Sequence, residues 1–347
     1  MNNALVLPLS LIVYGALTLY IPSQLAVLSS GEESILRHAR EPLQAFFQSG
    51  AHSPLYALLL KAAPQSGTVG PHWAGLLCGL AGIATAVRLL RGLAGAHAAP
   101  GALLLLAASP FLISQTRTLS PAPLMLLLVA LSYALFWTYL RGGHLGLLAG
   151  WAVVSVLAFS AQASLIYLPF TQALIALAYR TSYPQRHVFY WPALAAVTGL
   201  WIALFWQPLN RDWTVRLAGV TPEQSAFALD AFAALSTGVS GIDALAGAGL
   251  FALLLLSGLR ACADWRKDAR RGLLVGGLGM PCLLYALSPG NSALLVGALP
   301  PLCGLCAMGL RLYPRWARQG LWAALLLTYC WSYWHLYTQQ ILFAIKS

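Results

Sequence analysis

The stretch SSGEESILRHAREPLQAFFQSGAHSPLY, residues 29–56, gathers charge directly behind an apolar opening segment. In a chain of 347 residues of which 59% are hydrophobic and only 8% are charged, such a cluster is unusual, because soluble globular proteins are about 25% charged. The cluster therefore predicts a water-exposed loop that has a functional role. Its ionisable residues are Glu32, Glu33, Arg37, His38, Arg40, Glu41 and His52.

The composition around this loop predicts a polytopic membrane protein. Mean hydropathy is +0.72, and apolar runs of about 17–25 residues recur along the chain, the length that a bilayer core of about 30 Å requires of a helix. The net charge of +11 does not indicate a nucleic-acid partner, because the basic residues fall at the ends of the apolar runs. Membrane lipids are the partners that this pattern predicts.

The fold class predicted is therefore all-α, with about 11 transmembrane helices in a single membrane domain spanning residues 1–347. The expected spans are 4–28, 73–91, 100–115, 120–140, 145–161, 163–180, 188–207, 243–260, 272–288, 292–311 and 319–344.

The distribution of charge predicts a cytoplasmic N-terminus. With that orientation the inside loops collect 13 of the 20 basic residues, whereas the acidic residues, Asp264 and Asp268 excepted, fall outside. Lysine and arginine are enriched in cytoplasmic loops. The loop that follows the first span, and Glu32 and Glu33 with it, is thus expected on the external face.

Two external segments are longer than simple turns. Residues 29–72 contain ESILRHAREPLQAFF, interrupted at Pro42, and SPLYALLLKAA, and we expect each to form a short helix, the first lying in the membrane interface. Residues 208–242 carry Arg211 and Asp212 in NRDWTVR. Loops of this length are usually functional or disordered.

The adjacent carboxylates Glu32 and Glu33 are candidates for general-base or metal-binding chemistry. The alternative from chemistry alone is that they solvate the end of the first span. The order of motifs around them favours the chemical role over simple solvation. The acidic pair is followed by HSPLY, with His52, Pro54, Leu55 and Tyr56, and later by SQTRTLSP, with Arg117, between the third and fourth spans.

This order resembles the membrane-embedded GT-C glycosyltransferases, in particular the bacterial glycosyltransferase 39 family of protein mannosyltransferases and aminoarabinose transferases. The resemblance covers residues 1–180, a GT-C-like module. Residues 181–347 agree with the family only in general character, because they contain further helices and the loop at 208–242. The sequence departs from the family in three places: glutamate replaces the leading aspartate at Glu32, HSP replaces His-Pro-Pro, and Ala-Gln replaces the His-Tyr near the end of the fifth span.

The resemblance implies transfer of a sugar, a hexose or a pentose, from a polyprenyl phosphate to an acceptor at the external face. Glu32 or Glu33 would take the proton of the acceptor. The use of a divalent cation stays open, since some GT-C enzymes employ one and others none. The sugar, the acceptor and the oligomeric state are not specified. An outward-facing site and no visible organelle signal suit a bacterial inner membrane, with an internal eukaryotic membrane as the alternative.

On the donor side, Arg117 is the candidate for holding the lipid phosphate. The alternative is that its side chain only extends to the lipid headgroups. His52 is a candidate phosphate or carboxylate partner, or a helix cap. Tyr56 and Arg211 complete the expected binding residues. The alternative for Tyr56 is a packing role, and the alternative for Arg211 is a place in a solvated loop.

Two other functions compete with catalysis. A degenerate GT-C-like subunit that assists a membrane protein partner is favoured by the glutamate at Glu32, by the missing His-Tyr and by the absence of an evident external globular domain to hold an acceptor. A transporter is the other alternative, but transporters usually carry ionisable groups at mid-span and internal repeats, and neither is evident in this sequence.

Overall fold

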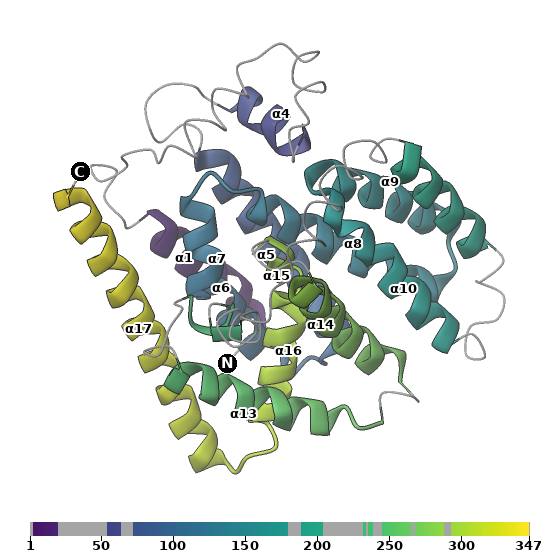
Figure 1. The fold of residues 1–347 in the computed structure, drawn as a ribbon. Coiled ribbons are helices and arrows are strands. Elements are labelled where there is room, and N and C mark those ends of the chain that lie inside the picture. Colours follow the sequence, from purple (N-terminus) through teal and green to yellow (C-terminus); the bar gives the residue numbers. More distant parts are fainter. Residues whose placement is uncertain are drawn as a thin grey trace.

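The helices of the computed structural model follow the apolar runs of the sequence (Figure 1). The structure describes residues 3–19, 54–63, 72–179, 189–203, 232–233, 235–238, 245–264, 268–287 and 293–346. Within these ranges all regular structure is helical, as predicted. The elements are α1 (Asn3–Leu19), α4 (Pro54–Ala62), α5 (His72–Leu93), α6 (Ala99–Ala107), α7 (Pro110–Arg117), α8 (Ala122–Gly142), α9 (Leu145–Ala161), the 3-10 helix η2 (Ala163–Ile166), α10 (Tyr167–Ala178), a helix at Phe189–Ala203, α13 (Leu245–Ala261), α14 (Ala269–Leu287), α15 (Ala293–Val296), α16 (Leu299–Leu310) and α17 (Arg315–Lys346).

Where the structure describes them, the expected spans overlap one helix or a pair of consecutive helices in this set; residues 20–28 of the first span and 204–207 of the seventh lie outside the described residues. Among the described residues, α5 and α8 are each long and apolar enough to cross a membrane, and the bent pair α6–α7 would supply a third such span. The short helix expected in SPLYALLLKAA is α4. The interfacial helix expected before Pro42 lies outside the described residues.

Two expected spans are broken helices, which corrects the prediction of one continuous helix for each. Residues 100–115 form α6 and α7, which meet at an angle of 40°. Residues 292–311 form α15 and α16, separated by a turn at residues 297–298. The cause is proline, which has no backbone N–H and collides with the preceding helical turn: Pro110 begins α7, and Pro300 and Pro301 lie in the first turn of α16.

The helix α5 lies at the centre of the bundle. It contacts α1, α6, α7, α8, α14 and α16, and more than half of its residues are buried. On α1, residues four apart point inward, since Val6, Ser10 and Tyr14 are almost completely buried, whereas Leu5 and Ile12 on the other side are largely exposed. This two-sided pattern suits a helix that packs on α5 with one face and meets lipid with the other.

The break between α6 and α7 leaves carbonyl groups that helix α17 satisfies. The Ser109 amide donates to the Leu106 carbonyl instead of the Leu105 carbonyl four residues back, which leaves the Leu105 carbonyl without its helical partner. The Leu112 amide likewise donates to Ser109 Oγ, which leaves the Ala108 carbonyl without its helical partner. The hydroxyl of Tyr329 donates to the Leu105 carbonyl at 3.2 Å, and that of Tyr333 to the Ala108 carbonyl at 2.7 Å. Buried backbone groups need such partners.

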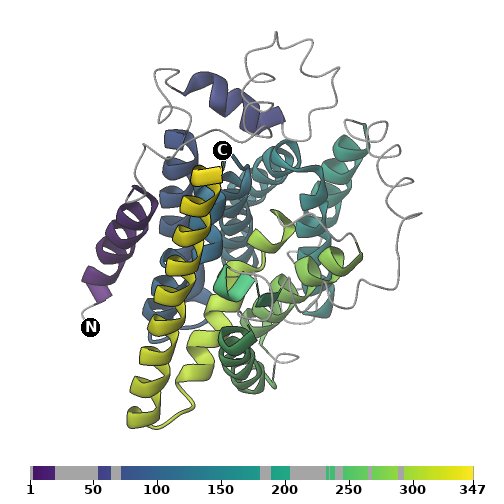
Figure 2. The same cartoon turned by 60° about the vertical axis from the view of Figure 1, so that its left-hand side comes forward.

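The two ends of the molecule differ in charge. Figure 2 shows that α17 begins at the end opposite α4 and finishes on the same side as α4. The arginines of the described helix ends away from α4 form what we call the cation-rich end; they are Arg88, Arg91, Arg141, Arg260, Arg270, Arg271, Arg311, Arg315 and Arg318. Asp264 and Asp268, the two carboxylates that the structure describes, lie at this end as well, in the connection between α13 and α14.

Candidate functional site

Arg117 is the last residue of α7 and lies between two other helices. Its guanidinium donates through Nη2 to the backbone carbonyl of Leu17 in the last turn of α1. The Nε atom is buried and has no hydrogen-bond partner among the described residues. Helix α17 contacts α7, and its Tyr333 hydroxyl donates to the carbonyl of Ala108 just before α7. Within the described part of the chain, Arg117 thus has one neutral hydrogen-bond acceptor and a donor nitrogen without a partner.

No described carboxylate neutralises this guanidinium. Asp264 and Asp268 pair with Arg270 and Arg271, the shortest of these contacts being 2.9 Å. Since α8 starts five residues after Arg117 and is 21 residues long, the cation-rich end lies about 30 Å away. A cation held at one end of an apolar bundle without a described counter-charge is suited to an anion that arrives from outside the helices.

Two hydroxyl groups lie beside Arg117. Thr116 Oγ1 donates to the Leu112 carbonyl at 2.7 Å and is 2.7 Å from the hydroxyl oxygen of Tyr14, which is completely buried on α1. The Tyr14 ring lies over Gly79 of α5, where a Cβ atom would come within 1.9 Å of the tyrosine oxygen. Helices α1, α5 and α7 therefore meet at one point, one residue before the guanidinium.

Tyr56, another expected binding residue, lies on α4 and is 3% exposed. The contacts that the structure describes bring α4 against α9, whereas Arg117 contacts α1. The described contacts therefore do not join Tyr56 to Arg117. The remaining expected site residues, Glu32, Glu33, His52 and Arg211, lie outside the described residues.

The segment with the acidic pair nevertheless starts and ends at described points. It leaves α1 two residues after Leu17, the acceptor of the Arg117 hydrogen bond, and returns to the described chain at Pro54, the first residue of α4. Within the described part, no group of three or more His, Cys, Asp or Glu side chains is arranged to hold a metal ion.

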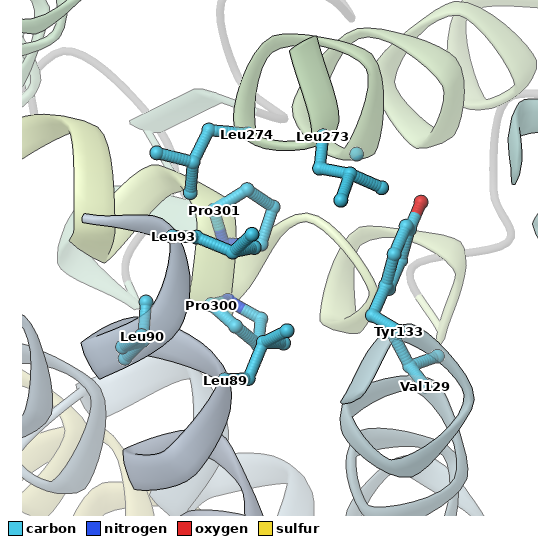
Figure 3. Close-up of a pocket in the computed structure, with 10 residues that line it drawn as sticks. Leu89, Leu90, Leu93, Val129, Tyr133, Leu273, Leu274, Pro300 and Pro301 are labelled. Carbon is cyan, nitrogen blue, oxygen red and sulfur yellow. The ribbon is translucent and has the colours of Figure 1, made fainter. Parts of the chain in front are cut away.

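A small apolar cavity lies in the bundle among α5, α8, α14 and α16 (Figure 3). Leucines of α5 and α14 line it together with Val129, Tyr133, Pro300 and Pro301. Pro300 and Pro301, in the first turn of α16, have no backbone N–H groups, so this helix start offers the cavity no donors from those two positions. The cavity has no described cation, and no described contact joins it to Arg117.

Sequence patterns missed Tyr14, Gly79 and Tyr333. A tyrosine within an apolar run is typical of core packing, and its partner 102 positions away cannot be read from local spacing. The one local signal was the threonine directly before Arg117, because a polar residue buried beside a charged one needs a partner.

No protein-family model matches the chain, and no curated protein matches its sequence. Its fold is nevertheless similar to two crystal structures of ArnT from Cupriavidus metallidurans. The apo structure aligns with a TM-score of 0.54 at 17% identity, over 84% of this chain and 57% of that one. The structure bound to undecaprenyl phosphate aligns with a TM-score of 0.59 at 16% identity, over 93% of this chain and 62% of that one.

These comparisons establish the fold. The chain has the GT-C-like helical fold of ArnT, as the resemblance of its motifs predicts, and its apolar helices belong to an integral membrane protein. The chain spans about three fifths of the length of the ArnT chains that it matches.

Proposed function

We propose that this protein is a glycosyltransferase that takes its sugar from a polyprenyl phosphate. The observation that carries the proposal is Arg117, a guanidinium at the end of a GT-C-like bundle that is hydrogen-bonded to the Leu17 carbonyl. Among the described residues its buried Nε has no hydrogen-bond partner and no carboxylate neutralises its charge. A structural neighbour with this fold binds undecaprenyl phosphate, a ligand whose anionic head such a guanidinium suits.

In the reaction proposed, the acceptor oxygen forms a bond to the anomeric carbon of the sugar as the bond between that carbon and the phosphate oxygen breaks. Arg117 stabilises the phosphate that leaves with the lipid, since a forked guanidinium matches phosphate oxygens. Glu32 or Glu33 takes the proton of the acceptor. His52 and Arg211 are proposed as further contacts to the phosphate or the sugar, and Tyr56 as a residue that supports them from α4.

We propose that Arg117 and the acidic pair face outward and that the cation-rich end lies in the cytoplasm of a bacterial inner membrane. The excess of arginine at the cation-rich end supports this orientation. Asp264 and Asp268 at the same end do not weigh against it, because acidic residues contribute little to topology. The lipid tail would stay in the bilayer while its phosphate reaches Arg117.

Lipid binding tests the donor site without a choice of sugar. The full-length protein in nanodiscs would be titrated with undecaprenyl phosphate and with undecaprenol, which lacks the phosphate. Loss of a hydrogen bond to a charged group corresponds to about tenfold or more in affinity, so we expect Arg117→Ala to weaken binding of undecaprenyl phosphate by at least that factor. Arg88→Ala, which removes an exposed arginine at the other end, is the matched control.

Equal affinity of Arg117→Ala and wild type for undecaprenyl phosphate would remove Arg117 from the donor site. If the wild-type protein binds neither lipid, the glycosyltransferase proposal fails. The mass of any sugar-charged lipid that co-purifies identifies the donor for a transfer assay, in which Glu32→Gln or Glu33→Gln is expected to slow transfer by about 10²–10⁴-fold while lipid binding is kept.

A further inference from the structure

Helices α1 and α7 approach each other over two glycines of α5. At Gly79 a Cβ atom would lie 1.9 Å from the Tyr14 hydroxyl oxygen, and at Gly75 it would lie 3.4 Å from the Thr116 carbonyl oxygen. The glycine at position 79 thus leaves a notch that the tip of the Tyr14 side chain fills, and Gly75 lets the last turn of α7 pack closely. Glycines at these positions permit the close approach of the backbones.

The hydroxyl group of Tyr14 is the donor in its bond to Thr116. Thr116 Oγ1 already uses its single hydrogen for the Leu112 carbonyl, at 2.7 Å. The 2.7 Å contact between the two hydroxyl oxygens therefore requires the hydrogen of Tyr14. Both groups are buried: without Thr116 the Tyr14 hydroxyl would lose this acceptor, whereas without the Tyr14 hydroxyl Thr116 keeps its bond to Leu112.

Helix α1 consequently holds the end of α7 at two successive points. Tyr14 donates to Thr116, and one turn later the carbonyl of Leu17 accepts from Arg117. The last turn of α7 cannot shift along α1 without breaking one of these bonds. Packing alone would be served by phenylalanine at position 14, whereas the hydroxyl fixes the register of α7 against α1.

We propose that Tyr14 is a positioning residue for Arg117: through its bond to Thr116 it sets the place at which the guanidinium meets the phosphate of the lipid donor. This inference rests on the proposed function. It assigns to a completely buried tyrosine part of the affinity for the phosphate group.

The test compares Tyr14→Phe with a matched control, Tyr313→Phe. The Tyr313 hydroxyl oxygen lies 2.8 Å from Ser257 Oγ, and Ser257 donates to the Leu253 carbonyl at 2.9 Å, so the same arrangement occurs at the cation-rich end. Both variants keep the ring and lose one bond between hydroxyl groups. Full-length protein in nanodiscs would be titrated with undecaprenyl phosphate and with undecaprenol, and the melting temperature of each variant measured.

We expect Tyr14→Phe to weaken binding of undecaprenyl phosphate about fivefold, the effect of one hydrogen bond, and to leave binding of undecaprenol unchanged. Tyr313→Phe should change neither. If Tyr14 had a purely structural role, Tyr14→Phe would weaken the binding of both lipids or would lower only the melting temperature. In the Arg117→Ala background, Tyr14→Phe should cause no further loss, because the group that it positions is gone.

Hydrogen exchange separates failure of this inference from failure of the proposed function. The Thr118 amide, which donates to the Ser114 carbonyl at 3.1 Å, reports on the last turn of α7 without any lipid. Faster exchange there in Tyr14→Phe, but not in Tyr313→Phe, supports the inference. Unchanged affinity in Tyr14→Phe beside a loss in Arg117→Ala overturns the positioning role and leaves the function intact. If the wild type binds no lipid, both proposals fall, whatever the exchange data show.

Discussion

Gln172 links three helices within the apolar interior. Its Oε1 atom accepts from Trp151 Nε1 at 2.6 Å, its Nε2 atom donates to Ser132 Oγ at 3.0 Å, and the side chain is completely buried. The amide therefore satisfies the indole N–H of α9 and a hydroxyl of α8 from its place on α10. Neither α9 nor α10 shows a polar stripe that would predict this arrangement.

Replacing Gln172 with alanine should lower the free energy of unfolding by about 2–4 kcal/mol, because it leaves the buried N–H of Trp151 unpaired and opens a cavity. Denaturant titration in detergent micelles measures this change. Gln115→Ala, the same replacement at a half-buried position where the amide accepts only from Ser120, is the control and should cost clearly less. Equal losses would contradict the role of the network.

Asp268 directly precedes α14 and interacts with two arginines in the first turn of that helix. Its Oδ1 accepts from the Arg270 amide at 3.0 Å, and its Oδ2 is 2.9 Å from Arg270 Nη2 and 3.8 Å from Arg271 Nε. Partial burial acts to raise the pKa of the Asp268 carboxyl, but the hydrogen bonds from Arg270 and the charges of Arg270 and Arg271 outweigh it, and the pKa lies below its ordinary value.

Asp268→Ala should therefore lower stability at pH 7 by about 1 kcal/mol, the usual effect of losing an N-cap. Since the folded pKa is depressed, the contribution of the charge is complete above the unfolded pKa and is lost as pH falls through the folded one. The difference between variant and wild type should shrink in acid, measured by thermal melts at several pH values. Asp264→Ala, at an exposed carboxylate with one contact of 3.8 Å, should change little at any pH.

Arg117 and Tyr14 show which parts of the site the sequence predicts and which it does not. Arg117 is visible because a charge in an apolar run is rare and costly, and the structure gives it a surrounding that suits an anion. Tyr14 was not foreseen because a hydroxyl at the tip of an aromatic ring hardly alters hydropathy. Its role depends on Gly79 and Thr116, which only the packing of three helices brings beside it.

At the scale of elements, α13 and α16 cross at an unusually short distance. A Cβ atom at Gly258 would lie 2.1 Å from the Leu305 carbonyl oxygen, and one at Gly309 would lie 2.2 Å from that of Leu254. Each glycine thus faces the backbone of the other helix, which cannot yield as a side chain can.

Gly258→Ala should accordingly destabilise the protein by about 2–3 kcal/mol or more, because the two helices must move apart. The control lies on the same helix: a Cβ at Gly249 meets nothing within 4 Å, so Gly249→Ala should be neutral or slightly stabilising. Melting temperatures of the two variants test the crossing. A normal melting temperature for Gly258→Ala would show that α13 and α16 do not depend on this approach.

The helices themselves were predictable because apolar length and charge at the ends mark a span directly. The breaks were not predicted, although Pro110, Pro300 and Pro301 stood in the sequence as signals. A proline in an apolar run can begin a helix, kink it or end it, as Pro8 and Pro281 inside α1 and α14 illustrate. Which of these occurs depends on whether another helix satisfies the freed carbonyl groups.

At the scale of the whole molecule, charge asymmetry was predictable and carries the orientation proposed. Thr118, beside Arg117, and Gln319, near the start of α17, are both exposed and lie at opposite ends. In a cysteine-free background, Thr118→Cys should react with a membrane-impermeant maleimide in right-side-out vesicles, and Gln319→Cys only in inside-out vesicles. The reverse pattern would place the cation-rich end outside the cell.

The GT-C-like fold was predictable only from the order of motifs, because apolar runs of similar length occur in many membrane proteins. The order of an acidic pair, HSPLY and an arginine between two spans was distinctive, although each motif alone is short. The arrangement of residues 181–347 carried no such motif, and their packing followed only from the structure.

The hydrogen bonds from α17 to the break between α6 and α7 bear on how the chain is made. Tyr329 and Tyr333 reach partners 224 and 225 positions earlier, so the carbonyls of Leu105 and Ala108 gain these partners only after α17 has been synthesised. During synthesis, residues 99–117 must remain hydrated or shielded by the insertion machinery until α17 arrives. The break between α6 and α7 is therefore paired only once α17 has packed against it, and a nascent chain halted before Arg315 would present the quality-control proteases with an unfinished span.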